Sequence, residues 1–406
     1  MTQVSTGRNR GVGARLGWPL KLFVGALLLL LILIILNAFA LNNETESAEL
    51  TVPGATLVPT TSGQLQVLDT GADGQPGQLP VVLIHGSAGA INWWDDLGPL
   101  LETSRRVIAI DLLGYGGSDK PDSDYSIETQ ANLVAQVLAA LKIPRAVMVG
   151  HSLGGKVVTS LEEQSPELVA GLVLIDSAPD DSFGELSGAA KASRVPLLGQ
   201  ALWRISPDFM VRRNLEQAFA PGFDVPDRFI ADVRAMTYPA YRESGTKGDE
   251  FTDQASLVDR LAGSGKPLLV IFGSEDQIFD ARESISAYAA IPGVKTLLIP
   301  GVGHSPQVEA PDQTAEAIAA FADSITADQR SEAMAKKHAT VAKHKAGKKK
   351  QQPAGGANQA KRPGQAGSSR TKQSGKGQAP GTGGRPSTKE QARIDREKAA
   401  AVTESP

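Results

Sequence analysis

The stretch Gly150-His151-Ser152-Leu153-Gly154 decides the fold. It follows the apolar run at 146–149 and precedes a segment, 156–163, with the composition of a helix. A serine between a strand and a helix is typical of a nucleophile elbow, in which glycines allow a strained turn that exposes the serine hydroxyl. The pattern therefore predicts a catalytic nucleophile at Ser152.

A small-residue loop, H-G-S-A-G at 85–89, follows the apolar run at 81–84. Such a loop can turn backbone N–H groups toward a ligand oxygen, so we predict that the N–H groups of Ser87 and Leu153 form an oxyanion hole. An ordinary strand-to-loop turn explains the loop alone equally well. We expect His85 to be structural.

The next apolar run, 106–111, leads into a glycine-rich loop at 114–121. Asp111 and Ser118 are residue types that hydrogen-bond to nearby backbone groups in turns. We therefore interpret this loop as structural rather than catalytic.

Two later apolar runs end in candidate acid and base residues. Residues 267–272 lead to Glu275 and Asp276, and residues 295–300 lead to His304. The order serine, aspartate, histidine is that of one triad scaffold among several. We expect Asp276 to be the acid, in preference to Glu275 and to Asp176, which ends the run at 172–175.

Histidine is scarce, which narrows the choice of base. The chain has five histidines. His338 and His344 lie in a Lys-rich tail, and the side chain of His151 should point away from its neighbour Ser152. His304 is therefore the predicted general base.

Five motifs make the sequence resemble the α/β-hydrolase family: I-H-G-S at 84–87, D-L-L-G-Y-G-G-S-D at 111–119, G-H-S-L-G-G at 150–155, G-S-E-D at 273–276 and G-H-S-P-Q-V-E-A-P at 303–311. The resemblance covers about residues 49–326. It implies an α/β fold with a mostly parallel eight-stranded sheet, helices on both faces and an α-helical cap. The most similar subgroups are capped esterases, C–C bond hydrolases and epoxide-hydrolase-like proteins. Epoxide hydrolases and haloalkane dehalogenases use an aspartate nucleophile, so Ser152 argues against both activities.

The resemblance implies acyl transfer from an ester or related carbonyl substrate, without a metal or an organic cofactor. The absence of cysteine excludes a thiolate nucleophile and thiolate metal sites. An acyltransferase or a C–C bond hydrolase could use the same triad. A binding protein that kept the fold is a third alternative.

The rest of the folded region divides into a core and an insertion. Residues 49–178 and 263–326 are predicted to form the core, with an early antiparallel strand at 63–69 and helices at 129–141 and 313–325. Residues 179–262 exceed what a strand crossover needs and are predicted to form the cap, with helical stretches visible at 195–205, 207–218 and 226–234. The cap carries Phe183, Trp203, Phe209, Met210, Phe219, Phe229, Met236, Tyr238 and Tyr241. Some of these should line an apolar pocket, although each one alone is better explained as packing between cap and core.

Residues 22–41 are apolar and long enough to span a bilayer. Arg8, Arg10, Arg15 and Lys21 precede them in a basic segment, 1–21, which should stay cytoplasmic. The expectation is a single-pass signal-anchor, with the catalytic domain on the periplasmic or extracellular side. The alternative is secretion after signal cleavage, because Ala38-Phe39-Ala40 is an A-x-A site.

Charge is distributed unevenly along the chain. The whole chain carries −3, but residues 327–406 carry +12 and the N-terminal flank +4, which leaves −19 for residues 41–326. The last eighty residues are rich in Lys, Gly, Gln and Pro, contain no aromatic residue and are predicted to be disordered. This tail is either solubilising or attracted to anionic lipid, to a surface polymer or to the acidic domain. Nucleic acid is the least expected partner, because stacking aromatics are missing.

Overall fold

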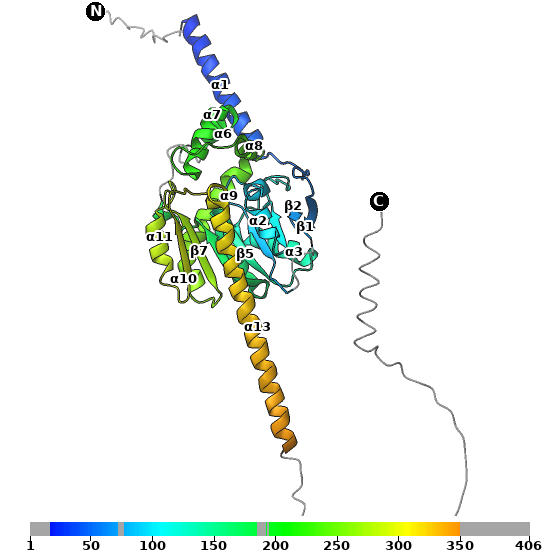
Figure 1. The fold of residues 1–406 in the computed structure, drawn as a ribbon. Coiled ribbons are helices and arrows are strands. Elements are labelled where there is room, and N and C mark those ends of the chain that lie inside the picture. The colour runs from blue at the N-terminus through cyan, green and yellow to red at the C-terminus, as the bar shows by residue number, and fades with distance from the viewer. Residues whose placement is uncertain (1–16, 72–76, 185–191, 193–194, 350–406) are drawn as a thin grey trace, which may run out of the picture. The chain divides into compact units, whose positions relative to one another are not determined.

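The sheet holds every predicted strand. The computed structural model describes residues 17–71, 77–184, 192 and 195–349. Eight strands form one sheet in the order β1-β2-β4-β3-β5-β6-β7-β8 (Figure 1). The strands are β1 (Thr56–Thr60), β2 (Gly63–Asp69), β3 (Val81–Ile84), β4 (Val107–Ile110), β5 (Ala146–His151), β6 (Val169–Ile175), β7 (Leu268–Gly273) and β8 (Lys295–Ile299).

Strand direction follows the prediction. β1 and β2 pair antiparallel, β2 joins β4 antiparallel, and all pairings from β4 to β8 are parallel. Only β1 had not been predicted from its own residues. Because the carboxyl ends of parallel strands lie at one edge, the residues that follow β3, β5, β6, β7 and β8 are brought together there.

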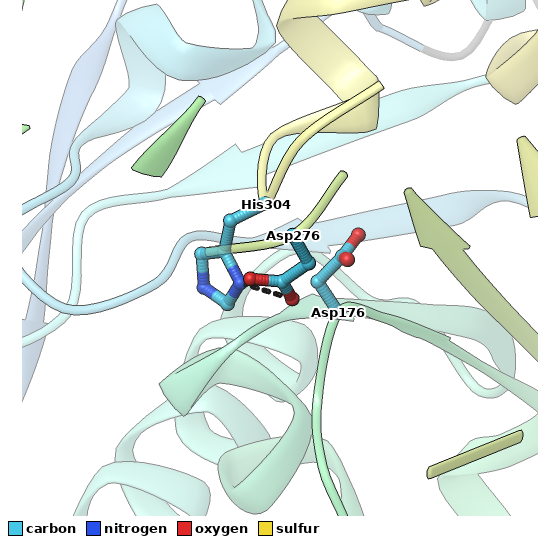
Figure 2. A group of neighbouring side chains, drawn as sticks. All are labelled: Asp176, Asp276 and His304. Carbon is cyan, nitrogen blue, oxygen red and sulfur yellow. Dashed lines mark hydrogen bonds and ion pairs between the residues drawn. The ribbon is translucent and has the colours of Figure 1, made fainter. Parts of the chain in front are cut away.

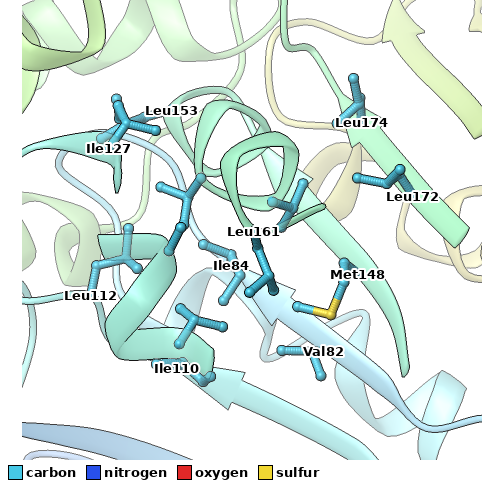
Figure 3. Packing of buried hydrophobic residues seen from close by; sticks show 14 of the residues in the cluster. Val82, Ile84, Ile110, Leu112, Ile127, Met148, Leu153, Leu161, Leu172 and Leu174 are labelled. Atoms are coloured by element: carbon cyan, nitrogen blue, oxygen red, sulfur yellow. The ribbon is translucent and has the colours of Figure 1, made fainter. Parts of the chain in front are cut away.

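Side chains alternate between the two faces of the sheet. On one face Val82, Ile84, Met148 and Leu172 pack under α3 (Ile127–Ala140) and α4 (Leu153–Gln164), as Figure 3 shows. On the opposite face the intervening strand residues pack on α2 (Gly98–Glu102) and α13 (Pro311–Lys349). Continuous burial on both faces explains why these strands are apolar runs rather than alternating ones.

The described residues of the insertion at 179–262 are mostly helical, as predicted, and the insertion is called the cap below. Its described elements are η3 (Asp181–Phe183), α6 (Leu198–Ile205), α7 (Asp208–Leu215), η4 (Glu216–Ala218), α8 (Asp227–Arg234), α9 (Tyr238–Gln254) and α10 (Leu257–Ala262). α9 was not predicted. Its buried Ala240, Ser244, Gly248 and Thr252 recur every four residues, a pattern of small residues that permits close packing rather than one of large apolar residues.

Gly248 shows why α9 needs small residues. A Cβ there would lie 2.8 Å from Leu153 Cδ1. The Nζ of Lys156, on α4, donates to the Gly248 carbonyl at 3.1 Å and to Thr252 Oγ1 at 3.2 Å. α9 therefore joins the cap to the helix that begins directly after Ser152.

The first and last elements of the described chain are both long helices. α1 (Trp18–Asn42) is long and apolar enough to cross a membrane, a property that fits either a membrane anchor or a signal peptide. α13 runs to Lys349, so the predicted disorder from residue 327 onward is wrong for residues 327–349. These residues are helical because they include many Ala and Lys, which favour helix. Arg8, Arg10 and Arg15, and residues 350–406 of the predicted tail, lie outside the described residues.

Candidate active site

Ser152 lies at the strained turn that the motif predicts. It separates β5 from α4 and has φ 50° and ψ −117°, a conformation that is costly for a residue with a side chain. The flanking glycines are needed for close approach, because a Cβ at Gly150 would lie 2.3 Å from the Gly154 carbonyl oxygen, and one at Gly154 would lie 2.3 Å from the Ile84 carbonyl oxygen. Close packing at Gly150 and Gly154 thus holds the backbone of Ser152 in this strained conformation.

His304 and Asp276 form a hydrogen-bonded pair at the same edge of the sheet. His304 Nδ1 lies 2.9 Å from Asp276 Oδ2, and both side chains are buried (Figure 2). The other oxygen of Asp276 accepts from the N–H groups of Ile278 at 2.7 Å and Phe279 at 3.2 Å. Burial alone would raise the pKa of Asp276, but His304 and these N–H groups lower it below the usual value. Asp276 therefore stays ionised, so the shared proton lies on His304 Nδ1 and Nε2 can accept a proton.

The third predicted residue, Ser152, is near this pair but not bonded to it. His151 Nε2 donates to the His304 carbonyl at 2.7 Å, and the two imidazole centroids are 5.1 Å apart. Within the described part of the chain, the His304 ring has its hydrogen bond with Asp276 and none with Ser152 Oγ. In ligand-free enzymes the bond between nucleophile and base is often long and tightens only with substrate.

The other two histidines of the core are held neutral. Burial lowers the pKa of His85 to about 4 and that of His151 to about 3. The Nδ1 of His85 donates to the Gly86 carbonyl at 2.8 Å and its Nε2 accepts from Leu112 N at 3.0 Å, so the ring is fully used in supporting the loop. This agrees with the structural role expected for His85 and leaves His304 as the available base.

The two predicted oxyanion donors belong to segments next to Ser152. Leu153 is the first residue of α4, where backbone N–H groups have no partner within the helix. Ser87 follows β3, and its neighbour Gly86 would place a Cβ 3.1 Å from Ser152 Cβ. Neither N–H is used in a backbone hydrogen bond among the described residues. Both donors are thus close to Ser152 and available to a ligand oxygen.

Asp176, the alternative acid, lies beside Asp276 rather than beside His304. Figure 2 shows Asp276 between His304 and Asp176. Asp176 is fully buried, and one of its oxygens accepts from Gly273 N at 3.1 Å. Burial and the charge of Asp276 raise the pKa of Asp176 well above its usual value. The neutral form of Asp176 is therefore favoured beside an ionised Asp276. Glu275, the third candidate acid, makes no hydrogen bond to His304 in the part of the chain that the structure describes.

Distances alone would allow Asp176, Asp276 and His304 to hold a metal ion, since their ligand atoms lie within 4.8 Å of one another. The nitrogen that such an ion would need is Nδ1 of His304, which is hydrogen-bonded to Asp276. The hydrogen bond between Asp276 and His304 therefore competes with metal binding at this nitrogen.

Glu309 is a site residue that sequence reasoning missed. Its carboxylate accepts from the N–H groups of Gly303, Ser305 and Ala220, at 3.1, 3.2 and 2.8 Å. Ser305 Oγ also donates to the Ala218 carbonyl at 2.6 Å. The loop that carries His304 is therefore tied to cap residues 218–220. A glutamate five residues after the histidine was visible in the sequence, but its partners in the cap were not.

A cavity of about 550 Å³ lies between the cap and the core. Ser87 and Ala88 line it from the core, and Phe279, whose ring centroid is 5.6 Å from that of His304, lines it beside the site. Trp203, Met210 and Tyr241 are the predicted cap residues that line the cavity. Phe219 and Phe229 instead pack against Trp93 and join cap to core. Ser152 and His304 do not themselves line the cavity.

The sequence model of the alpha/beta hydrolase fold matches residues 80–311. The chain belongs to the α/β-hydrolase fold family. It is 32% identical over 244 residues to a 2-hydroxymuconate semialdehyde hydrolase from Pseudomonas sp., a match that covers 57% of this chain and 82% of the relative. An uncharacterised protein of Mycobacterium tuberculosis is 29% identical over 257 residues, which cover 60% of this chain and 75% of that protein.

Solved structures agree on the fold of this hydrolase. An esterase from Thermogutta terrifontis superposes with a TM-score of 0.55 at 24% identity, covering 67% of this chain and 99% of the esterase. With the family assignment and the hydrolase relatives, this identifies the protein as a hydrolase enzyme with the α/β-hydrolase fold.

Proposed function

We propose that this enzyme is a membrane-anchored serine hydrolase that cleaves a carboxylic ester, or a related carbonyl substrate, through an acyl-enzyme on Ser152. The observation that carries the proposal is the 2.9 Å hydrogen bond from His304 Nδ1 to Asp276 Oδ2, next to a strained turn that presents a serine. In such an arrangement the histidine activates the serine as a nucleophile, and the carboxylate stabilises the charge that forms on the histidine.

The mechanism has two steps. His304 Nε2 takes the proton of Ser152 as its Oγ attacks the carbonyl carbon, and it then gives that proton to the departing alcohol. In the second step His304 takes a proton from water, which attacks the acyl group and releases the acid with Ser152 restored. Asp276 keeps the imidazole in the useful tautomer and stabilises the imidazolium.

Charge that develops on the carbonyl oxygen would be bound by the N–H groups of Ser87 and Leu153. Each such donor is worth on the order of 3 kcal/mol in the transition state. The positive end of α4 points in the same direction, since Leu153 is its first residue. The cavity beside Ser87 would receive the acyl group or the alcohol.

The membrane part of the proposal rests on α1. Its length and composition suit a bilayer span, and the basic flank before it favours a cytoplasmic N-terminus, with the hydrolase domain outside. The helix continues through Ala40 to Asn42, and Ala38 and Leu41 are buried against the folded domain. Cleavage at the A-x-A site would remove part of this packing, which favours an uncleaved anchor. The basic tail would bind anionic lipid or a surface polymer.

A C–C bond hydrolase is the second candidate, because a relative at 32% identity is a 2-hydroxymuconate semialdehyde hydrolase. The same triad and oxyanion hole would serve an attack on a carbonyl carbon of a substrate of that kind. Turnover of 2-hydroxymuconate semialdehyde but not of esters would favour this candidate.

The test is hydrolysis of a short-chain aryl ester by the wild type and by Ser152→Ala. We expect turnover by the wild type and its loss in the variant, with an unchanged circular dichroism spectrum. Product analysis with added alcohol separates hydrolysis from acyl transfer. Equal turnover by both proteins would contradict the serine mechanism.

A further inference from the structure

The C-terminal end of α1 is fixed to the cap and to the core. Asn42 Oδ1 accepts from Gln200 Nε2 of α6 at 3.0 Å, and a carboxylate oxygen of Glu44 accepts from Tyr238 N of α9 at 3.3 Å. Two residues later, Glu46 and Lys120 exchange backbone hydrogen bonds at 2.9 and 2.8 Å. No free linker therefore separates α1 from the hydrolase domain.

The folded domain covers α1 well inside its apolar segment. Ile34 and Asn37 are half-buried and Ala38 and Leu41 are buried, which is the spacing of one helix face. At about 1.5 Å per residue, Ile34 lies about 10 Å from Leu41 along the axis. Because the apolar segment would lie in lipid, the part of the domain beside it lies at the depth of the bilayer surface.

The helices at this position expose apolar side chains. α6 contacts the C-terminal part of α1, as Figure 1 shows, and α7 follows α6 in the chain. Ile205 is 72% exposed and Phe209 is 70% exposed. Three more apolar side chains are exposed, those of Leu197, Leu198 and Met210. Together with Ile205 and Phe209 they form what is called the apolar patch below. In water such a group is costly, whereas in a lipid interface it is favourable.

The same two helices line the cavity. Leu202 and Trp203 of α6 and Val211 of α7 face it, and Met210 both lines it and belongs to the apolar patch. The cavity extends to Ser87 and Phe279. α6 and α7 form one wall of it, and the apolar patch lies on the outer side of that wall.

From this arrangement we propose that the apolar patch inserts into the bilayer that holds α1, and that the substrate is a long-chain carboxylic ester of a membrane lipid, whose acyl chain enters the cavity between α6 and α7. The inference rests on the proposed function, both the anchor and the serine chemistry. The occupant of the patch is lipid because α6, which carries part of the patch, contacts α1, the helix that would lie in the bilayer.

The experiment compares two substrates in the full-length protein reconstituted in vesicles. One is a diacyl phosphatidylglycerol in the vesicle, followed by fatty-acid release, and the other is a soluble short-chain aryl ester. The variant Ile205→Glu/Phe209→Glu should lower lipid hydrolysis tenfold or more and change aryl-ester turnover less than twofold. The control Leu100→Glu, at an exposed apolar position on core helix α2, should change neither rate more than twofold.

The outcomes separate the two proposals. If the wild type cleaves the aryl ester but not the vesicle lipid, or if Ile205→Glu/Phe209→Glu cleaves the lipid at the wild-type rate, the inference is overturned and the proposed function stands. If neither ester is cleaved, the proposed function itself fails.

A second measurement does not depend on activity. The chain has no cysteine, so Ile205→Cys, Phe209→Cys and Leu100→Cys each give a single labelling site. A polarity-sensitive fluorophore at 205 and 209 should be quenched by brominated lipid, and one at 100 should not. Equal quenching at all three positions, or none at 205 and 209, would overturn insertion of the patch.

Discussion

The core and the cap of this hydrolase place their important side chains in different ways. In the core, Ser152, Asp276 and His304 each lie at or shortly after the end of a parallel strand, so pairing of the strands brings these strand ends to one edge of the sheet. In the cap, Trp203, Met210 and Val211 reach the cavity from short helices whose positions depend on packing. Chemistry is thus determined by local sequence at strand ends, whereas selectivity depends on contacts between distant residues.

The largest effect should come from the core. Asp276→Asn should lower kcat by about 10³-fold or more, because an amide can donate to His304 and favour the wrong tautomer. Asp176→Asn is the matched control and should cost less than about fivefold, since burial and the charge of Asp276 already favour the neutral form of the Asp176 carboxyl. Steady-state kinetics of the two variants on one ester measure both losses in kcat. Equal losses in the two variants would make Asp176 part of the catalytic group.

The contact between core and cap should give an intermediate effect. Glu309→Ala removes the acceptor for three backbone N–H groups, two on the His304 loop and one on the cap. We expect kcat to fall about 10- to 100-fold with a smaller change in KM, together with a lower Tm, because buried donors lose their partner. Glu309→Gln keeps one acceptor oxygen and should recover part of both losses. An unchanged kcat in Glu309→Ala would separate the cap from the positioning of His304.

A change in the cap should alter selectivity and not chemistry. Leu202→Trp fills part of the 550 Å³ cavity, so kcat/KM for long acyl esters should fall about tenfold relative to short ones. Turnover of the shortest ester should stay within about twofold. A uniform loss on esters of every length would contradict the division between core and cap.

The smallest expected effect is on how the free energy of unfolding depends on pH. The pKa of Asp176 is raised in the folded protein, so above pH 4 the unfolded chain releases a proton that the folded chain keeps. The free energy of unfolding therefore falls as pH rises, by up to about 1.4 kcal/mol for each pH unit between the two pKa values. Asp176→Asn should remove this fall and gain more stability over the wild type at pH 7 than at pH 4. Denaturant unfolding at both pH values measures it.

Sequence patterns sufficed for the centre of the sheet because strands β3 to β7 are buried on both faces. Val81–Ile84 and Val169–Ile175 are uninterrupted apolar runs, and the glycines around Ser152 mark a turn that other residues could not make. β1, with a mixed burial pattern at the edge of the sheet, offered no such signal.

The cap was harder to predict because its helices are defined by their neighbours. Gly248 and Ser244 lower the helical propensity of α9, yet they are needed where α9 meets α4. The roles of Glu309 and Asp176 depend on residues nearly a hundred positions away, which a single sequence does not pair. The site's chemistry could therefore be predicted, and its supporting contacts could not.

The most direct test of the central claim is labelling with a fluorophosphonate, which reacts with an activated serine, followed by peptide mass spectrometry. The account predicts one label per chain, on Ser152, and loss of labelling in a folded His304→Gln variant. A label on another residue, or undiminished labelling of Ser152 in His304→Gln, would contradict the claim that Ser152, His304 and Asp276 act as one unit.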